Sequence, residues 1–294
     1  KKPRELIWII GMLLYFCLMA EAFFGYLLPW GNMSYWAGQV IVNLFSYIPV
    51  IGETLTEWIR GDYFISDITL NRFFAFHVIF LPLAILALVF AHILALHHVG
   101  SNNPDGIEIK DYKDESGKPI DGVAFHPFHT SKDLVAIIIF LILYFAAVFY
   151  APEMGGLFLE VDNFEPADPL KTPEHIVPSW YFTPYYAILR AIPNAALGAV
   201  FLVTAVLLFV FLPWLDRCSV KSIRYRGWQY KVALFSFVVS FIVLGYLGMQ
   251  PATGVYVLLA RIFTIIYFAF FLLMPFYTKL EKTKPVPHRV VYKK

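Results

Sequence analysis

The chain has 294 residues, of which 59% are hydrophobic and only 15% are charged. A soluble domain of this size cannot bury that much apolar surface, so the composition indicates an all-α integral membrane protein. The net charge of +2 gives no indication of a nucleic-acid partner. The two cysteines are far apart and form no CxxC or CxxCH motif, which argues against a disulfide framework, a zinc site or a covalently attached c-type haem.

Six apolar segments are long enough, or nearly so, to cross a bilayer, whose core needs about 20 helical residues. They are residues 6–29, 72–96, 133–151, 195–216, 230–249 and 254–278. If the spans alternate direction, 18 lysine and arginine residues fall on one side and five on the other. The positive-inside rule then places both termini in the cytoplasm.

The loops on the far side are long. Residues 30–71 are amphipathic and aromatic, which favours a position at the membrane surface. Residues 152–194 are rich in proline and acidic side chains, and long loops of this kind often carry function. The loop 97–131 is polar and contains the turn signal SNNPDG.

The segment 72–98 carries His77 and His92 inside an otherwise apolar helix. Their interval corresponds to about 22 Å of rise and a net rotation of about 60°, which puts both imidazoles on roughly one side. Such histidines could simply hydrogen-bond between helices. Two of them at this separation favour two stacked metal centres. The other histidines lie in loops or at span ends, so the partner ligands are expected from another segment.

Two glycines of the first span have nearly the same interval. Gly11 and Gly25 are about 21 Å apart along a helix and nearly in phase. Small residues often serve helix packing. The matching period favours a second interpretation, in which each glycine leaves room for a flat macrocycle.

Five motifs occur in the order typical of one family. They are GYLLPWGNMSYWAGQVI (25–41), TLNRFFAFHVIFLPL (69–83), HHVGSNNPDG (97–106), FHPFHTSKD (125–133) and WYFTPYYAILRAIPN (180–194). The chain thereby resembles cytochrome b, the quinone-handling subunit of the cytochrome bc complexes. The resemblance runs through the whole chain and corresponds to the third through eighth helices of that family, so we expect the first two to be missing.

The resemblance implies two b-type haems. His77 would ligate the low-potential haem and His92 the high-potential haem, with the second axial ligands supplied by the missing N-terminal segment. The interval between them is one residue longer than in the mitochondrial pattern. One extra residue turns a helix by about 100°, so we expect a local adjustment of the helix, at about Pro82.

For quinol oxidation, the resemblance implies a site on the non-cytoplasmic side, with Tyr26, Tyr181 and Tyr186. The family's PEWY motif reads PSWY here, so Ser179 replaces a glutamate thought to accept a proton. A serine hydroxyl is no base at neutral pH, and Glu174 is a candidate substitute. Glu174 could equally be a solvated loop carboxylate, because a base must come within hydrogen-bond reach of its proton.

For quinone reduction, the resemblance implies a site on the cytoplasmic side with His97, Lys132 and Asp133, and with Ser101 and Asn102 nearby. His97 is rotated by about 200° from His77, which suits a quinone contact better than a haem ligand. Asp133 could instead be a helix N-terminal charge.

The expected architecture has six transmembrane helices in two parts. Residues 1–98, with an interfacial loop 32–61, would form half of a haem-binding four-helix bundle. A cytoplasmic loop (99–132) would lead to a C-terminal membrane domain (133–278) containing the quinol-site loop 152–194, and residues 279–294 would form a cytoplasmic tail.

The resulting hypothesis is the cytochrome b of a bacterial respiratory quinol–cytochrome c reductase in the inner membrane, which couples ubiquinol oxidation to proton translocation. Its expected partners are a Rieske-type iron–sulfur subunit, a membrane-anchored c-type cytochrome and a second copy of the complex. Two alternatives are a di-haem membrane anchor of a dehydrogenase and a non-redox transporter with histidines on a proton path.

Overall fold

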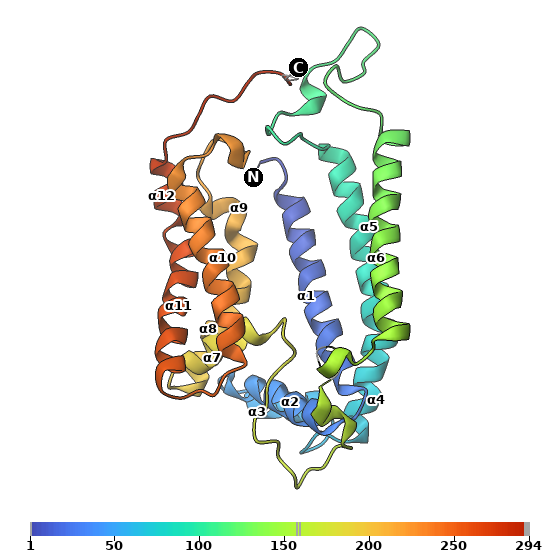
Figure 1. Cartoon of the computed structure of the whole chain (residues 1–294), viewed down its shortest axis with the longest axis vertical. Coiled ribbons are helices and arrows are strands. Elements are labelled where there is room, and N and C mark those ends of the chain that lie inside the picture. The colour runs from blue at the N-terminus through green and yellow to red at the C-terminus, as the bar shows by residue number, and fades with distance from the viewer. Residues whose placement is uncertain (1, 157, 159, 291–294) are drawn as a thin grey trace.

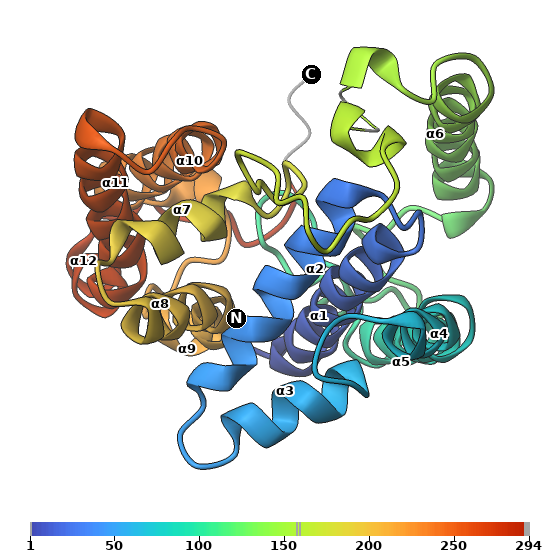
Figure 2. The same ribbon diagram turned by 90° about the horizontal axis from the view of Figure 1, so that it is seen from below.

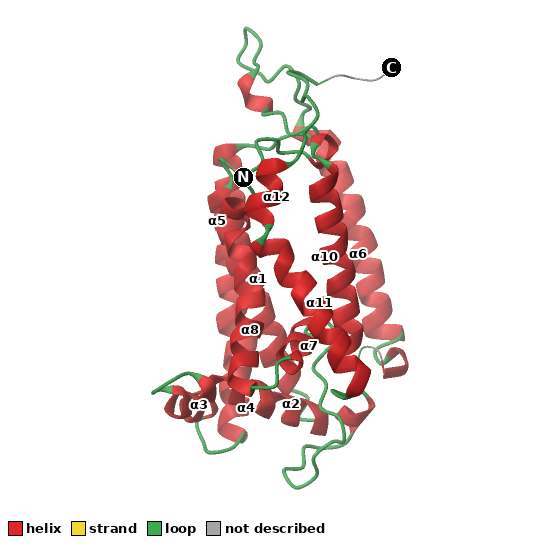
Figure 3. Ribbon diagram, turned by 90° about the vertical axis from the view of Figure 1, so that its left-hand side faces the viewer, coloured by secondary structure: helices red, strands yellow, loops and turns green. Residues whose placement is uncertain are grey.

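The computed structural model describes residues 2–156, 158 and 160–290, whose regular secondary structure is helical apart from isolated β-bridges in the loops (Figures 1 and 3). Among them, six helices or runs of helix are long and apolar enough to cross a membrane, which confirms the six expected spans. The spans are α1 (Glu5–Leu27), α4 with α5 (Asp67–Ala75 and Leu81–Val99), α6 (Thr130–Tyr150), α8 with α9 (Ala195–Leu207 and Leu212–Leu215), α10 (Trp228–Gly248) and α11 (Gly254–Leu272).

Three shorter helices lie near one end of the spans and run across them (Figures 1 and 2). They are α2 (Asn32–Asn43), α3 (Gly52–Arg60) and α7 (Thr183–Ala191). A last helix, α12 (Met274–Leu280), lies at the opposite end, the end where α1 begins.

The helix boundaries follow from local sequence. Ser66 and Thr69 form a reciprocal capping box at the start of α4, and the side chain of Asn194 accepts a hydrogen bond from the Leu197 N–H at the start of α8. Helices α3 and α5 end at Gly61 and Gly100, whose φ angles of 78° and 87° suit glycine.

The spans form two packed groups and one separate helix. Helices α7, α8, α10 and α11 share a core that includes Ile188, Leu244, Tyr267 and Phe271. Helix α1 packs against α5, and a second core joins α1, α2 and α4. Helix α6 stands apart in Figure 2 and contains no buried residue.

Ion pairs tie the loops together at the end where α1 begins. Arg4 donates two hydrogen bonds of 2.8 Å to the carboxylate of Glu108, which also pairs with Lys221 at 2.5 Å. The guanidinium of Arg226 is buried and binds Asp216 at 2.6 Å and Glu281 at 2.5 Å. These contacts join the loops before α1, after α5, after α9 and after α12.

Candidate functional site

The two intramembrane histidines each lie against one of the two predicted glycines. A Cβ added to Gly25 would come within 2.8 Å of Nδ1 of His77. A Cβ added to Gly11 would lie 3.3 Å from Cε1 of His92. The two glycines of α1 therefore lie at the same heights as the two histidines. Each missing side chain leaves room for an imidazole where α1 packs against the span formed by α4 and α5.

A π-helical turn brings the two intervals into phase. It covers Phe76–Phe80, and the Leu81 N–H donates to the Phe76 carbonyl, five residues back. A π turn takes up one extra residue, so the interval from His77 to His92 has the phase of 14 α-helical residues, which is the interval of the glycines. The expected adjustment occurs just before Pro82, which lacks the N–H needed to continue the α-helical pattern.

The hydrogen bonds of His77 determine which nitrogen is free. Its Nδ1 lies 2.9 Å from the backbone carbonyl of Glu21, and a carbonyl only accepts, so Nδ1 carries the proton and Nε2 is free to bind a metal. The Glu21 carboxylate lies 3.2 Å from the same Nδ1. Sequence reasoning missed Glu21, although a carboxylate inside an apolar span is a signal of function in itself.

The surroundings of His92 also suit a haem ligand. Its Nδ1 is buried and has no hydrogen-bond partner among the described residues. A cavity of about 770 Å³ is lined by His92, Gly11 and aromatic side chains of α1 and α10. A neutral imidazole, a glycine backbone and a largely apolar cavity together fit a b-type haem.

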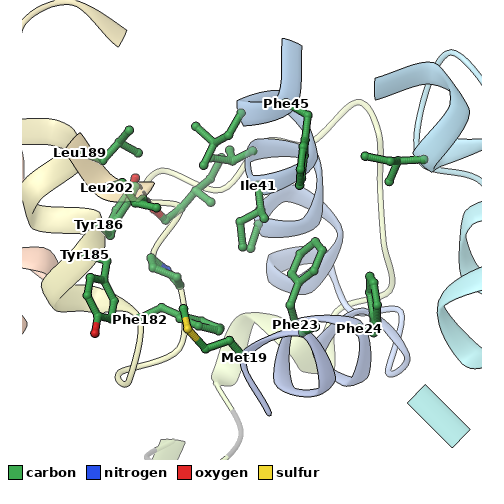
Figure 4. A pocket seen from close by; sticks show the side chains of 17 residues that line it. Met19, Phe23, Phe24, Ile41, Phe45, Phe182, Tyr185, Tyr186, Leu189 and Leu202 are labelled. Atoms are coloured by element: carbon green, nitrogen blue, oxygen red, sulfur yellow. Dashed lines mark hydrogen bonds between the residues drawn. The ribbon is translucent and has the colours of Figure 1, made fainter. Parts of the chain in front are cut away.

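A second, apolar pocket of about 360 Å³ lies between the two groups of helices, near α2 and α7 (Figure 4). One wall comes from α1 and α2, with Phe23, Phe24 and Ile41. The facing wall comes from α7 and α8, with Tyr186 and Leu202. A mostly apolar pocket of this size suits a hydrophobic ring ligand such as a quinol.

The three tyrosines predicted for quinol oxidation differ in their contacts with this pocket. Tyr186 lines it, and its hydroxyl donates to the Ile176 carbonyl at 3.0 Å. The ring of Tyr181 packs at 4.8 Å on the ring of Phe182, which lines the pocket. The hydroxyl of Tyr26 donates to the carboxylate of Glu160, a residue that sequence reasoning missed.

Two further positions concern the proton acceptor, namely Ser179 and Glu174. Ser179 is half-buried and its carbonyl accepts from the Phe182 N–H at 2.8 Å. Glu174 is exposed, and its carboxylate has no hydrogen-bond partner among the residues that the structure describes.

The residues predicted for quinone reduction lie on different elements. His97 and Asp133 are exposed at the ends of α5 and α6. Nζ of Lys132 lies 3.9 Å from the centre of the Phe128 ring. Ser101 and Asn102 are also exposed, and Asn102 pairs with Glu108 through the backbone. This second site stays a prediction.

Two family models of known proteins match the chain. The family model "Cytochrome b(N-terminal)/b6/petB" matches residues 1–160, and the model "Cytochrome b(C-terminal)/b6/petD" matches residues 166–268. Because the N-terminal family model begins to match at residue 1, it does not support the expectation that the first two helices are missing.

Individual proteins are similar over nearly the whole chain. The cytochrome b of Allochromatium vinosum is 57% identical over 99% of this chain and 72% of its own length. The cytochrome b of Rickettsia prowazekii is 46% identical over 98% of this chain and 69% of its own length. A solved structure described as a hyperthermophilic respiratory Complex III superposes with a TM-score of 0.86 at 38% identity, covering 95% of this chain and 71% of the other. The chain belongs to the cytochrome b family.

Proposed function

We propose that this chain is the haem-binding and quinol-oxidising subunit of a bacterial respiratory quinol–cytochrome c reductase. The observation that carries the proposal is the pair of glycine–histidine contacts at two heights of the α1–α5 interface, beside an apolar pocket. The similarity to a respiratory Complex III chain supports it.

The two histidines would each hold one b-type haem. Nε2 of His77 would bind the low-potential haem, with Nδ1 fixed by the Glu21 carbonyl, and His92 would bind the high-potential haem. When bound, the two haems supply one-electron carriers stacked across the membrane.

The apolar pocket would bind ubiquinol. Its walls of aliphatic and aromatic side chains would exclude water, and Tyr26, Tyr181 and Tyr186 would supply polar groups at its margin. The second quinone site, for reduction, would use His97, Lys132 and Asp133, with Ser101 and Asn102 nearby. Glu174 stays a prediction as the group that replaces the family's glutamate.

The membrane orientation follows from the basic loops. The pocket end of the spans would face the periplasm, and the end with the Arg4, Lys221 and Arg226 ion pairs would face the cytoplasm. One electron of each quinol would leave to a Rieske-type iron–sulfur subunit and then to a membrane-anchored c-type cytochrome. The other would cross the membrane, and the complex would be a homodimer.

A redox difference spectrum of the purified complex tests the proposal. We expect two b-type haem signals, one of which is reduced by quinol in the presence of an inhibitor of the second quinone site. A preparation without b-type haem would support a transporter instead. Two haems without quinol–cytochrome c reductase activity would support a dehydrogenase anchor.

A further inference from the structure

The apolar pocket lacks a base of its own. A quinol releases two protons when it is oxidised, yet the pocket is lined almost only by apolar groups, and Ser179 holds the place of the family's glutamate. A proton acceptor would therefore have to be a carboxylate outside the pocket wall. This inference rests on the function proposed above.

Glu160 is such a carboxylate. Its side chain is half-buried, and the Tyr26 hydroxyl donates a hydrogen bond to its Oε2. Nδ2 of Asn163 lies 3.4 Å from the same hydroxyl oxygen and donates to it. The Tyr26 oxygen therefore accepts one hydrogen bond while it donates another, the arrangement of a group that can relay a proton.

The loop that carries Glu160 is fixed on the protein. The Asn32 N–H donates to the Glu165 carbonyl at 2.8 Å, and the Ala167 N–H donates to the Trp30 carbonyl at 3.0 Å. The Ser34 N–H binds Oδ1 of Asn163 at 2.8 Å. Gly31 allows this close approach, because a Cβ there would lie 2.6 Å from the Asn163 carbonyl oxygen. Glu160 is thus held in place by the start of α2 rather than hanging in solvent.

Tyr26 connects this loop to the pocket wall. It lies on α1 two residues after Phe24, which lines the pocket together with Phe23. Tyr26 is therefore on the same helix as one wall of the pocket and is hydrogen-bonded to the loop that carries Glu160.

We propose that Glu160 accepts a proton of quinol oxidation, passed on by the hydroxyl of Tyr26. As the quinol O–H bond breaks, its proton binds the Tyr26 oxygen, and the proton already on Tyr26 moves to Oε2 of Glu160. Tyr26 is restored, and the carboxylate becomes a carboxylic acid. The two electrons leave to the one-electron acceptors of the complex, and Glu160, open to solvent on one side, releases its proton to water.

The charges around Glu160 suit this role. Burial raises the pKa of its carboxyl, the negative charge of Asp162 raises the pKa further, and the Tyr26 hydrogen bond opposes both. Tyr26 on α1 and Asp162 on its own loop are the titratable groups that face it. A base with a pKa closer to the working pH than that of an ordinary glutamate transfers protons more effectively.

The test compares variants of the purified complex, with haem content measured by difference spectroscopy. In Glu160→Gln we expect both haem signals to be kept, quinol–cytochrome c turnover to fall about 100-fold and the acid limb of the pH profile to disappear. Glu160→Asp should keep an acid limb at a reduced rate. Glu165→Gln, an exposed position on the same loop, is the matched control and should behave like the wild type.

Four results separate the possibilities. Wild-type turnover with an unchanged acid limb in Glu160→Gln would overturn the proposal. So would a loss of the limb in Glu174→Gln but not in Glu160→Asp or Glu160→Gln. If the unaltered complex holds both haems but oxidises no quinol, the proposed function fails rather than the role of Glu160. If Glu160→Gln does not assemble, an acid limb in Glu160→Asp identical to the wild-type limb in position and rate rejects the role.

Discussion

The imidazole of His77 occupies the space that a side chain at position 25 would fill. An added Cβ at Gly25 would lie 2.8 Å from Nδ1, a distance at which the ring or the backbone must shift, and 3.0 Å from Nε2, which is also tight. The corresponding contact between Gly11 and His92 is looser, with 3.3 Å to Cε1. The two glycine–histidine pairs are therefore equivalent in position, but an added methyl group has more room at Gly11 than at Gly25.

This difference in available space predicts that replacing glycine with alanine has different effects at positions 25 and 11. Gly25→Ala should displace His77 and remove one of the two b-type haem signals, because the ring cannot move without losing its bond to the Glu21 carbonyl. Gly11→Ala needs a shift of only a few tenths of an ångström and should keep both signals. The difference spectrum of each purified variant measures this, and two full signals in Gly25→Ala would contradict it.

The apolar pocket predicts a selective loss of quinol oxidation. Leu202→Trp would fill part of the pocket, and a loss of quinol binding free energy of about 1–3 kcal/mol, the usual size of an overpacking penalty, corresponds to an affinity loss of about 5-fold to 150-fold. Steady-state kinetics should show a raised KM for quinol with unchanged haem spectra. Val203→Trp is the matched control, because Val203 is the next residue of α8 but is 51% exposed. Equal effects of the two changes would argue against this pocket as the quinol site.

The buried Arg226 predicts a large loss of stability. Arg226→Met would leave Asp216 and Glu281 without their shared cation, and breaking such a buried group costs about 3–5 kcal/mol. Arg289→Met removes a half-exposed partner of Asp121, where solvent screens the ion pair, and should destabilise the protein much less. Denaturant titration in detergent compares the two variants, and similar midpoints would contradict the prediction.

Glu108 predicts a pH dependence of stability. The Arg4 hydrogen bonds, followed by those of Lys221, lower the pKa of Glu108 to about 2 against partial burial. A carboxyl with a lowered pKa in the folded state stabilises the protein above its unfolded pKa of about 4.3, and this contribution is lost as the pH falls from about 5 towards 2. Glu108→Gln should therefore destabilise the protein at pH 7, and the difference from the wild type should shrink below pH 4.

Thermal unfolding between pH 7 and pH 3 measures this effect. Glu115→Gln is the control, because Glu115 is exposed in the same loop and has no described hydrogen-bond partner. A constant difference between Glu108→Gln and the wild type over that range would show that the Glu108 ion pairs do not set the acid limit.

Much of the fold could be predicted because it depends on local signals. Continuous apolar runs define the six spans, and the clusters of basic residues alternate with them. The matching intervals of the two glycines and the two histidines could also be found, because both are close to whole numbers of helical turns, although the sequence does not show that each glycine faces an imidazole. Periodicity along one chain segment is enough for all of these.

The remaining features depend on contacts between distant segments. Tyr26 and Glu160 are separated by 134 positions, and the loop 152–194 has no periodic pattern that could place its carboxylates. Of its acidic residues, Glu174 is the sequence-based candidate for the proton acceptor because it is near Ser179 in the chain. Glu160 is instead held beside Tyr26 by the docking of the loop on α2. The pairing of Arg226 with Asp216 and Glu281 could not be predicted either, because it joins separate loops.

The π-helical turn at Phe76–Phe80 also affects how relatives are compared. Because the turn absorbs a residue locally, two proteins can differ by one in the number of residues between their haem-binding histidines and still point both rings the same way. Alignment gaps in this helix then belong at the turn, within reach of Pro82, rather than near His92. For this reason, the number of residues between the two histidines is a poor guide to subgroups within the family. The direction of the second imidazole can stay the same when that number changes by one.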